Sequence, residues 1–214
     1  MRLTQQFLSI NEYIRDGKPI KELLGIIMHW TGPNGHNARQ VWNYFENDCP
    51  KIKYYSSANY IIDFTGEIIQ CVPDGERTFN CGSYKIDPDS KVIYTDWARE
   101  KFGKYANIER YSNYKLVTNS PNNCTIGIEM CAIDETGAFR GATINSAIEL
   151  VSYLCYKYGK NSDIVGTHNM VVGWKDCPRL WVNKPYLYDA FIKDVDRLIM
   201  ASNYKNLNVN ERMK

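Results

Sequence analysis

Short apolar runs that end in polar or turn residues are the feature that most restricts the fold of this chain. LLGIIMHWTG at 23–32 leads into a loop, CTIGIEMCAID at 124–134 is rich in β-branched residues, and SDIVGTH at 162–168 is shorter. Runs of this length are typical of buried β-strands. The segment SANYIIDFTGEIIQCV at 57–72 divides around a Phe-Thr-Gly turn and predicts a hairpin.

Helical patterns alternate with these strands. Apolar residues at helical spacing predict helices at 3–16, 37–47, 95–105, 145–159 and 184–199. Asn37 is the expected N-cap of the second helix, and Gly159 is the expected C-cap of the fourth. The alternation predicts an α/β fold of the mixed α+β kind, with a central mixed β-sheet flanked by helices.

The length of 214 residues suits a single domain or a single domain with a tail. We expect the domain to cover residues 1–199 and a polar tail without an apolar face to follow at 200–214, where the chain is loose. Residues 83–123 are polar, rich in tyrosine and irregular, and contain the short helical pattern named above.

Composition excludes several classes of protein. A net charge of +2 provides no basic surplus for nucleic acid. No segment reaches the ~18 apolar residues of a membrane span, and the first 18 residues lack the apolar run of a signal peptide, so we expect synthesis in the cytoplasm. The seven cysteines are odd in number, irregularly spaced and without a CxxC pair, which argues against a disulfide framework.

Two of the three histidines follow buried strands. His29 ends the strand GIIMH and His168 follows the strand DIVGT, so both are expected where loops build sites. Together with the thiolate of Cys177, they would supply the three protein ligands of a catalytic zinc site. The spacing between His168 and Cys177 is not that of a zinc finger, so buried histidines in a polar network and a small buried cysteine remain the alternative.

Glu129 interrupts the apolar strand TIGIEMC. Burial of an unpaired carboxylate is costly and raises its pKa, which predicts a cation, a hydrogen-bond network or a functional cavity beside it. Strand alternation places Gly127 on the same face, where it leaves room for the carboxylate. A general base beside a metal-activated water needs such surroundings, whereas a structural ion pair with arginine or lysine is the alternative. Lys175, two residues before Cys177, would stabilise an oxyanion, or is simply solvated.

The segments IIMHWTG, TIGIEMC and GTHNMVVGWKDCPRLW together resemble the zinc N-acetylmuramoyl-L-alanine amidases of the type-2 amidase family. That family includes phage endolysins, bacterial autolysins and peptidoglycan recognition proteins. The three segments occur in the family's order, and the resemblance runs from about Gly25 to Val195. It implies hydrolysis of the amide bond between N-acetylmuramic acid and L-alanine of peptidoglycan by a zinc-activated water.

The resemblance also implies a role for each of five side chains. His29, His168 and Cys177 match the ligands of one zinc ion. Glu129 matches the general base, and Lys175 matches the lysine that stabilises the tetrahedral intermediate. Peptidoglycan is then the partner, with no nucleic acid or membrane, and the chain is expected to be a monomer.

The sequence departs from the family in three places. A tyrosine that some phage members use in catalysis is replaced by Ala58, and the Trp-His pair of many relatives is replaced by Phe79-Asn80, which leaves substrate contacts there open. Residues 83–123 form a longer segment than compact members have. This segment is either a wall or lid of the peptide groove or a plain surface insertion.

The residues leave several functions open. The expected setting is a phage or prophage endolysin, or an autolysin, that reaches the cell wall after release or by non-classical export. A peptidoglycan-binding protein of the same fold without catalysis is the first alternative. A cysteine hydrolase that uses Cys177 and His168 is the second, although an activated thiol favours a helix N-terminus. Some phage amidases also bind a polymerase, which these residues do not test.

Overall fold

A mixed β-sheet forms the centre of the molecule in the computed structural model, which describes residues 1–32, 35–89, 91–109 and 119–212, with the backbone alone for 202–212. Its strand order is β1-β4-β3-β5-β2-β6. The strands are β1 (Arg2–Gln5), β2 (Gly25–Trp30), β3 (Tyr60–Ile62), β4 (Glu67–Gln70), β5 (Thr125–Met130) and β6 (Val165–Thr167). Neighbouring strands run parallel except in the β3–β4 hairpin, which the sequence predicts.

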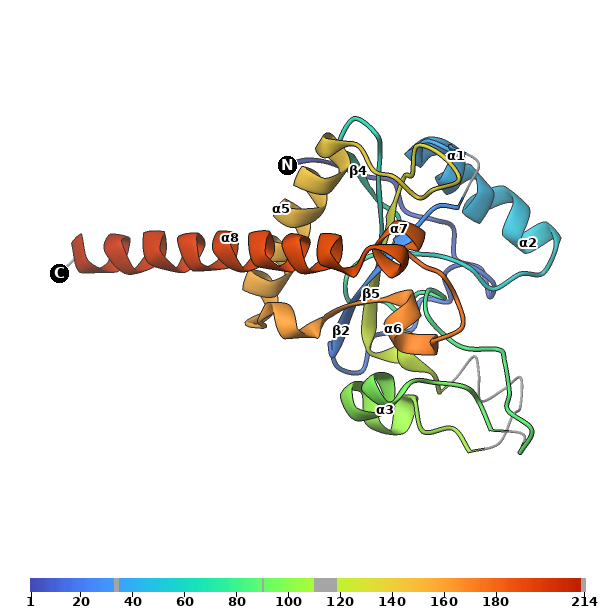
Figure 1. Cartoon of the computed structure of the whole chain (residues 1–214). Helices are drawn as coiled ribbons and strands as arrows, with labels where there is room; N and C mark the ends of the chain where they lie inside the picture. The colour runs from blue at the N-terminus through green and yellow to red at the C-terminus, as the bar shows by residue number, and fades with distance from the viewer. Residues whose placement is uncertain (33–34, 90, 110–118, 213–214) are drawn as a thin grey trace.

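Helices surround this sheet, so the predicted mixed α/β class is confirmed (Figure 1). The α-helices are α1 (Ala38–Asn43), α2 (Cys49–Lys51), α3 (Asp96–Phe102), α5 (Gly141–Tyr158), α6 (His168–Val172), α7 (Arg179–Asn183) and α8 (Pro185–Arg212). A π-helical stretch η1 (Tyr44–Asp48) and the 3-10 helices η2 (Gly103–Tyr105), η3 (Pro121–Asn123) and η4 (Ser162–Ile164) complete them. None of the helices in the described residues is both long and apolar enough to span a bilayer.

Both predicted helix caps are confirmed. The side chain of Asn37 accepts a hydrogen bond from the backbone N–H of Gln40, whose own side chain accepts one from the backbone of Asn37, so the pair forms a capping box. Gly159 ends α5 in the left-handed conformation, with φ of 60°, which glycine adopts without steric cost.

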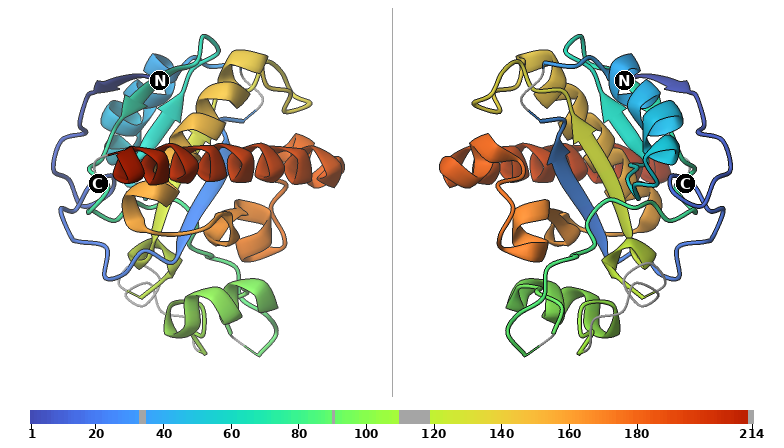
Figure 2. Two further views of the ribbon diagram at one scale, coloured as in Figure 1. Left: turned by 90° about the vertical axis from the view of Figure 1, so that its left-hand side faces the viewer. Right: turned by 90° about the vertical axis from the view of Figure 1, so that its right-hand side faces the viewer.

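One face of the sheet packs against α5 and α8, which cross it in Figure 2. Alternate residues of the two central strands face this side, and Ile26, Met28, Ile126 and Ile128 are fully buried there. Trp181 of α7 completes this cluster. The alternation leaves the intervening residues of the same strands for the opposite face.

The opposite face is covered by two further clusters, one beneath α1 and one formed with α3 and α6. Glycines let aromatic rings lie directly on the strands. A Cβ on Gly25 would lie 2.8 Å from the ring of Phe102, and one on Gly166 would lie 2.4 Å from the ring of Trp97. Aromatic residues of the 83–123 segment therefore pack into the core; residues 110–118 lie outside the described residues.

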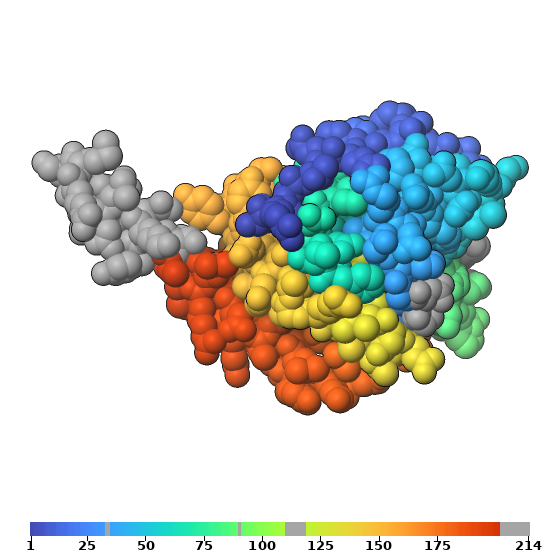
Figure 3. All heavy atoms as spheres, turned by 90° about the horizontal axis from the view of Figure 1, so that it is seen from above, coloured from blue at the N-terminus to red at the C-terminus, as the bar shows by residue number. Residues whose placement is uncertain are grey.

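The predicted helix at 3–16 is wrong. Residues Arg2–Gln5 form β1, which pairs in parallel with β4, and the chain continues along it with hydrogen bonds from Gln6 N–H to Gln70 O and from Leu8 N–H to Cys71 O. Figure 3 shows this dark blue amino-terminal segment on the surface of the molecule. The helical spacing misleads because Leu8 is buried while Ile10 is 68% exposed, and because the free edge of β4 offers backbone partners that a local pattern does not reveal.

The last helix is longer than predicted. The helical pattern ends near Ile199, whereas α8 continues to Arg212. Residues 200–212 contain neither glycine nor proline, so no residue in them forces the backbone out of the helix.

Candidate metal centre

The predicted metal ligands meet at the carboxyl ends of parallel strands. His29 is the second-last residue of β2, and it pairs in register with Glu129 of β5. His168 begins α6 directly after β6, which pairs with the other side of β2. Cys177 lies in the loop between α6 and α7. Because parallel strands end at the same edge of a sheet, residues far apart in sequence are brought together there.

The three predicted ligand side chains, hereafter the ligand cluster, are close enough to hold one ion. Their ligand atoms all lie within 4.8 Å of one another. The Nδ1 atoms of His29 and His168 are 3.1 Å apart, and Cys177 Sγ is 3.7 Å from His29 Nδ1. The imidazole rings meet edge-on at 75°. All three side chains are buried.

The protonation states of the ligand cluster suit zinc. Burial, followed by the positive charge of Lys175, lowers the pKa of His29 to about 3, and burial also holds the pKa of His168 well below its ordinary value. Both imidazoles are therefore neutral, as metal ligands must be. Burial raises the pKa of Cys177 to about 12, so its thiolate needs a cation to form. Two nitrogens and one sulfur are a donor set that zinc accepts.

Glu129 lies beside the ligand cluster in a partly buried position. Its Oε2 atom is shielded from water and has no hydrogen-bond partner among the described residues. Burial raises the pKa of Glu129 to about 8, and the positive charge of Lys175 acts in the opposite direction. None of the ion pairs found within the described residues involves Glu129, which removes support for a structural ion pair. A carboxyl group that holds a proton near neutral pH suits acid–base chemistry.

The loop that carries Lys175 and Cys177 is fastened to the start of α6. The backbone N–H of Asn169 donates to Cys177 O over 2.9 Å, and its side-chain amide donates to Lys175 O over 3.0 Å. The peptide bond between Cys177 and Pro178 is cis. Lys175 itself is exposed, and its positive charge acts on Glu129 and on all three members of the ligand cluster. The loop therefore presents one ligand and one cation from a fixed backbone.

Residues of the 83–123 segment stand next to this loop. The indole N–H of Trp174 donates to Ser83 Oγ over 3.2 Å, the ring of Tyr84 packs edge-on against the indole, and Lys85 Nζ lies 4.3 Å from its centre. The segment thus contacts Trp174, the residue directly before Lys175. This placement suits a wall of the groove.

Asn80 is a site residue whose contact sequence reasoning did not identify. Its Oδ1 atom lies 3.4 Å from Nε2 of His29. A Cβ on Gly127 would lie only 2.7 Å from Cβ of Asn80, so the space that glycine leaves beside Glu129 is filled by this side chain. That glycine was the available signal, although it did not reveal which residue fills the space. Ala58, another of the three departures from the family, is fully buried in the cluster beneath α1.

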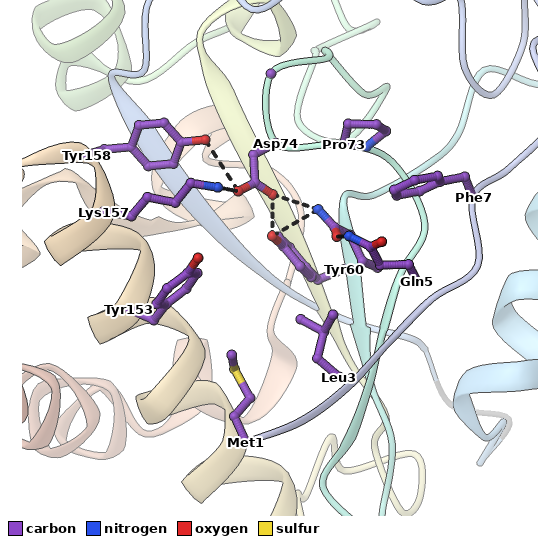
Figure 4. A pocket seen from close by; sticks show the side chains of 12 residues that line it. Met1, Leu3, Gln5, Phe7, Tyr60, Pro73, Asp74, Tyr153, Lys157 and Tyr158 are labelled. Carbon is purple, nitrogen blue, oxygen red and sulfur yellow. Dashed lines mark hydrogen bonds and ion pairs between the residues drawn. The ribbon is translucent and has the colours of Figure 1, made fainter.

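A separate hollow of about 430 Å³ lies on the side of the sheet covered by α5, away from the ligand cluster (Figure 4). At its centre the buried carboxylate of Asp74 accepts hydrogen bonds from Tyr60, Gln70, Lys157 and Tyr158. These donors satisfy the carboxylate, so it ties β3, β4 and α5 together instead of being left open for chemistry.

A family model described as N-acetylmuramoyl-L-alanine amidase matches residues 18–180. A probable N-acetylmuramoyl-L-alanine amidase of Bacillus licheniformis is 30% identical over 93% of this chain and 48% of its own length. The amidase CwlL of the same organism is 28% identical over the same shares. The chain thus spans about half the length of these curated relatives.

The fold is also shared with solved structures. The catalytic domain of PlyG superposes with a TM-score of 0.64 at 17% identity, over 93% of this chain and 96% of that domain. The range matched by the family model includes the ends of β2, β5 and β6 and the loop with Cys177. With most of its residues covered by the family model, the chain belongs to the N-acetylmuramoyl-L-alanine amidase family.

Proposed function

We propose that this chain hydrolyses the amide bond between N-acetylmuramic acid and L-alanine of peptidoglycan, with one zinc ion held by His29, His168 and Cys177. The observation that carries this proposal is the meeting of two neutral imidazoles and a thiol at one sheet edge, beside a carboxyl group with a raised pKa. Membership of the amidase family supports the choice of bond. The proposed catalytic unit is residues 1–199.

Zinc, when bound, supplies a Lewis acid that activates water and polarises a carbonyl near neutral pH. Glu129 is the proposed general base, since its carboxylate form takes a proton from the attacking water. It then passes this proton to the alanine nitrogen as the amide bond breaks. In the metal-free chain burial raises the pKa of Glu129 to about 8, so its carboxyl group can hold a proton near neutral pH.

Lys175 is the proposed electrostatic partner of the developing oxyanion. Its side chain is exposed, its backbone carbonyl accepts a hydrogen bond from Asn169, and its positive charge acts on His29 and Glu129. A fixed positive charge stabilises negative charge that appears only in the transition state. Residues Ser83–Lys85, against Trp174, form the proposed wall of the peptide groove.

The first test is the release of new L-alanine amino termini from purified peptidoglycan, with and without a strong chelator. We expect release that the chelator abolishes and added zinc restores. No release from walls of several peptide types would contradict the proposal and leave a non-catalytic peptidoglycan-binding protein, for which zinc content becomes the next measurement.

A cysteine hydrolase is the less favoured reading of the same residues. Burial raises the pKa of Cys177 to about 12, the reverse of what an activated thiol needs. Iodoacetamide sensitivity without chelator sensitivity would favour it. An endolysin or autolysin is the proposed setting, with the chain acting as a monomer on the cell wall.

A further inference from the structure

His29 has two ring nitrogens with different surroundings. Nδ1 faces His168 Nδ1 at 3.1 Å and Cys177 Sγ at 3.7 Å, and Nε2 faces Oδ1 of Asn80 at 3.4 Å. A neutral imidazole carries its proton on one nitrogen and offers a lone pair on the other. Which nitrogen is the ligand therefore depends on what Asn80 presents to Nε2.

The orientation of the Asn80 amide is set by two buried hydroxyl groups. Its nitrogen lies 3.0 Å from Thr78 Oγ1 and 3.3 Å from Thr125 Oγ1. Each threonine hydroxyl has a single proton, and both protons are committed elsewhere: Thr78 donates to Asn59 Oδ1, and Thr125 donates to Pro121 O. Both hydroxyls can therefore only accept from Asn80, which turns its oxygen toward His29.

Asn59 fixes the direction of the whole hydrogen-bond chain. Its side-chain nitrogen donates to two backbone carbonyls, Pro73 O and Glu76 O, each over 3.2 Å. Its oxygen accepts from Thr78 and from the backbone N–H of Gly127. Carbonyl oxygens of the backbone cannot donate, so the side-chain nitrogen of Asn59 must face Pro73 O and Glu76 O. The direction of the hydrogen bonds that lead through Thr78 and Asn80 to His29 follows from this orientation.

We infer that Asn80 is a positioning residue for the ligand cluster, which holds His29 with its proton on Nε2 and its Nδ1 lone pair toward His168 and Cys177. This inference deepens the proposed function, because it concerns the zinc site on which that function rests. Partners of this kind orient a ligand ring, and their loss typically weakens metal binding about 10- to 100-fold. Gly127 belongs to the same arrangement, because any side chain there would displace Asn80.

The first experiment measures zinc affinity by chelator competition in the full chain and in three variants. Asn80→Leu removes the acceptor and should weaken zinc binding about 10- to 100-fold. Asn80→Asp keeps an oxygen acceptor for His29 and should stay closer to the parent than Asn80→Leu. Ser57→Ala is the matched control, because it deletes a buried hydrogen bond to the backbone of Phe79 without touching His29. It should lower the melting temperature and leave zinc affinity unchanged.

The absorption spectrum of the cobalt-substituted protein adds a readout that a merely structural role would not move. We expect Asn80→Leu to shift the cobalt bands, because the ring of His29 loses its fixed orientation, and Ser57→Ala to leave them in place. Parental zinc affinity and an unchanged cobalt spectrum in Asn80→Leu would overturn the inference, even if the parent binds zinc and releases L-alanine.

A second measurement needs no variant and no metal. The nitrogen-15 shifts of the metal-free parent chain report which ring nitrogen of His29 carries the proton. A proton on Nε2 is expected, and a proton on Nδ1 would overturn the inference. Failure of the proposed function looks different, since the parent chain would then show the Nε2 proton but release no L-alanine.

Discussion

At the residue scale, the chemistry rests on side chains whose surroundings shift their protonation. Glu129 and Cys177 have pKa values raised by burial, and the two histidines of the ligand cluster have lowered ones. Without a metal ion, these four groups at the sheet edge are therefore largely neutral near neutral pH.

Glu129→Gln should keep zinc and lose turnover by about 100- to 10,000-fold, because the amide cannot carry the proton. L-alanine release and zinc content, measured on the same preparation, check this. Glu135→Gln changes an exposed glutamate in the loop after β5 and serves as the control, with activity retained. Full activity in Glu129→Gln would remove Glu129 from the mechanism.

Lys175→Ala should also retain zinc while turnover falls by about 100- to 1000-fold, because one source of oxyanion stabilisation is lost. The loop itself should persist, since Asn169 contacts its backbone and not the lysine side chain. Lys184→Ala, an exposed lysine before α8, is the matched control. Equal losses in both variants would argue that general surface charge, and not Lys175, matters.

The metal-free protein should lose stability as pH rises because of Glu129. Its pKa is about 8 in the folded chain, above the ordinary value of 4.5, so the folded state keeps a proton that the unfolded state has released. This contribution is complete below pH 4.5 and is lost as pH rises through about 8. The melting temperatures of the parent and of Glu129→Gln, both measured in the presence of chelator between about pH 5 and pH 9, should diverge toward high pH. Parallel curves would contradict the shift.

At the element scale, glycines let neighbouring segments approach the strands that carry the site. Gly25, Gly127 and Gly166 lie on β2, β5 and β6 and face Phe102, Asn80 and Trp97 respectively. Helix α3 is further joined to α6 by a hydrogen bond from Thr95 N–H to Val171 O over 3.1 Å. The segment that looks irregular in sequence therefore supports the helix that begins with His168.

Gly166→Ala should destabilise the fold by about 1–3 kcal/mol, because the new methyl group would overlap the ring of Trp97. Gly141→Ala is the control, since a Cβ there meets no atom within 4 Å. Chemical denaturation of both variants measures the difference. A Gly166→Ala variant as stable as Gly141→Ala would mean that α3 does not pack on β6 as described.

At the scale of the whole molecule, the metal and the fold should stabilise each other. The ligand cluster joins β2, the start of α6 and the loop before α7, so an ion held there links three separate parts of the chain. A ligand that binds only the folded state raises stability in proportion to the logarithm of its concentration. This coupling can be measured without substrate.

Zinc should therefore raise the melting temperature of the parent chain, and excess chelator should reverse the rise. Cys177→Ser should weaken this response, because a neutral hydroxyl is a poor replacement for thiolate. Cys155→Ser changes a buried cysteine outside the ligand cluster and is the control, with the zinc response preserved. An unchanged zinc response in Cys177→Ser would remove Cys177 from the ligands.

Local patterns were enough to predict much of the molecule. Short apolar runs predicted the central strands, and Asn37 and Gly159 marked two helix ends, because strand length and cap chemistry depend on neighbouring residues. The strand ends at His29 and His168 indicated a site because loops that follow buried strands commonly build sites. The chemistry of Glu129 inside an apolar strand pointed to the same place.

Only the tertiary structure decided the remaining features, because they depend on partners distant in the chain. Residues 2–5 became a strand since the edge of β4 was available 65 residues later, as the pairing of Arg2 with Glu67 shows. The contact of Asn80 with His29 requires hydroxyls and amides from Asn59, Thr78 and Thr125, which no periodicity connects. By itself the sequence determined which residue types could bind a metal, and the fold decided which nitrogen of His29 faces His168 and Cys177.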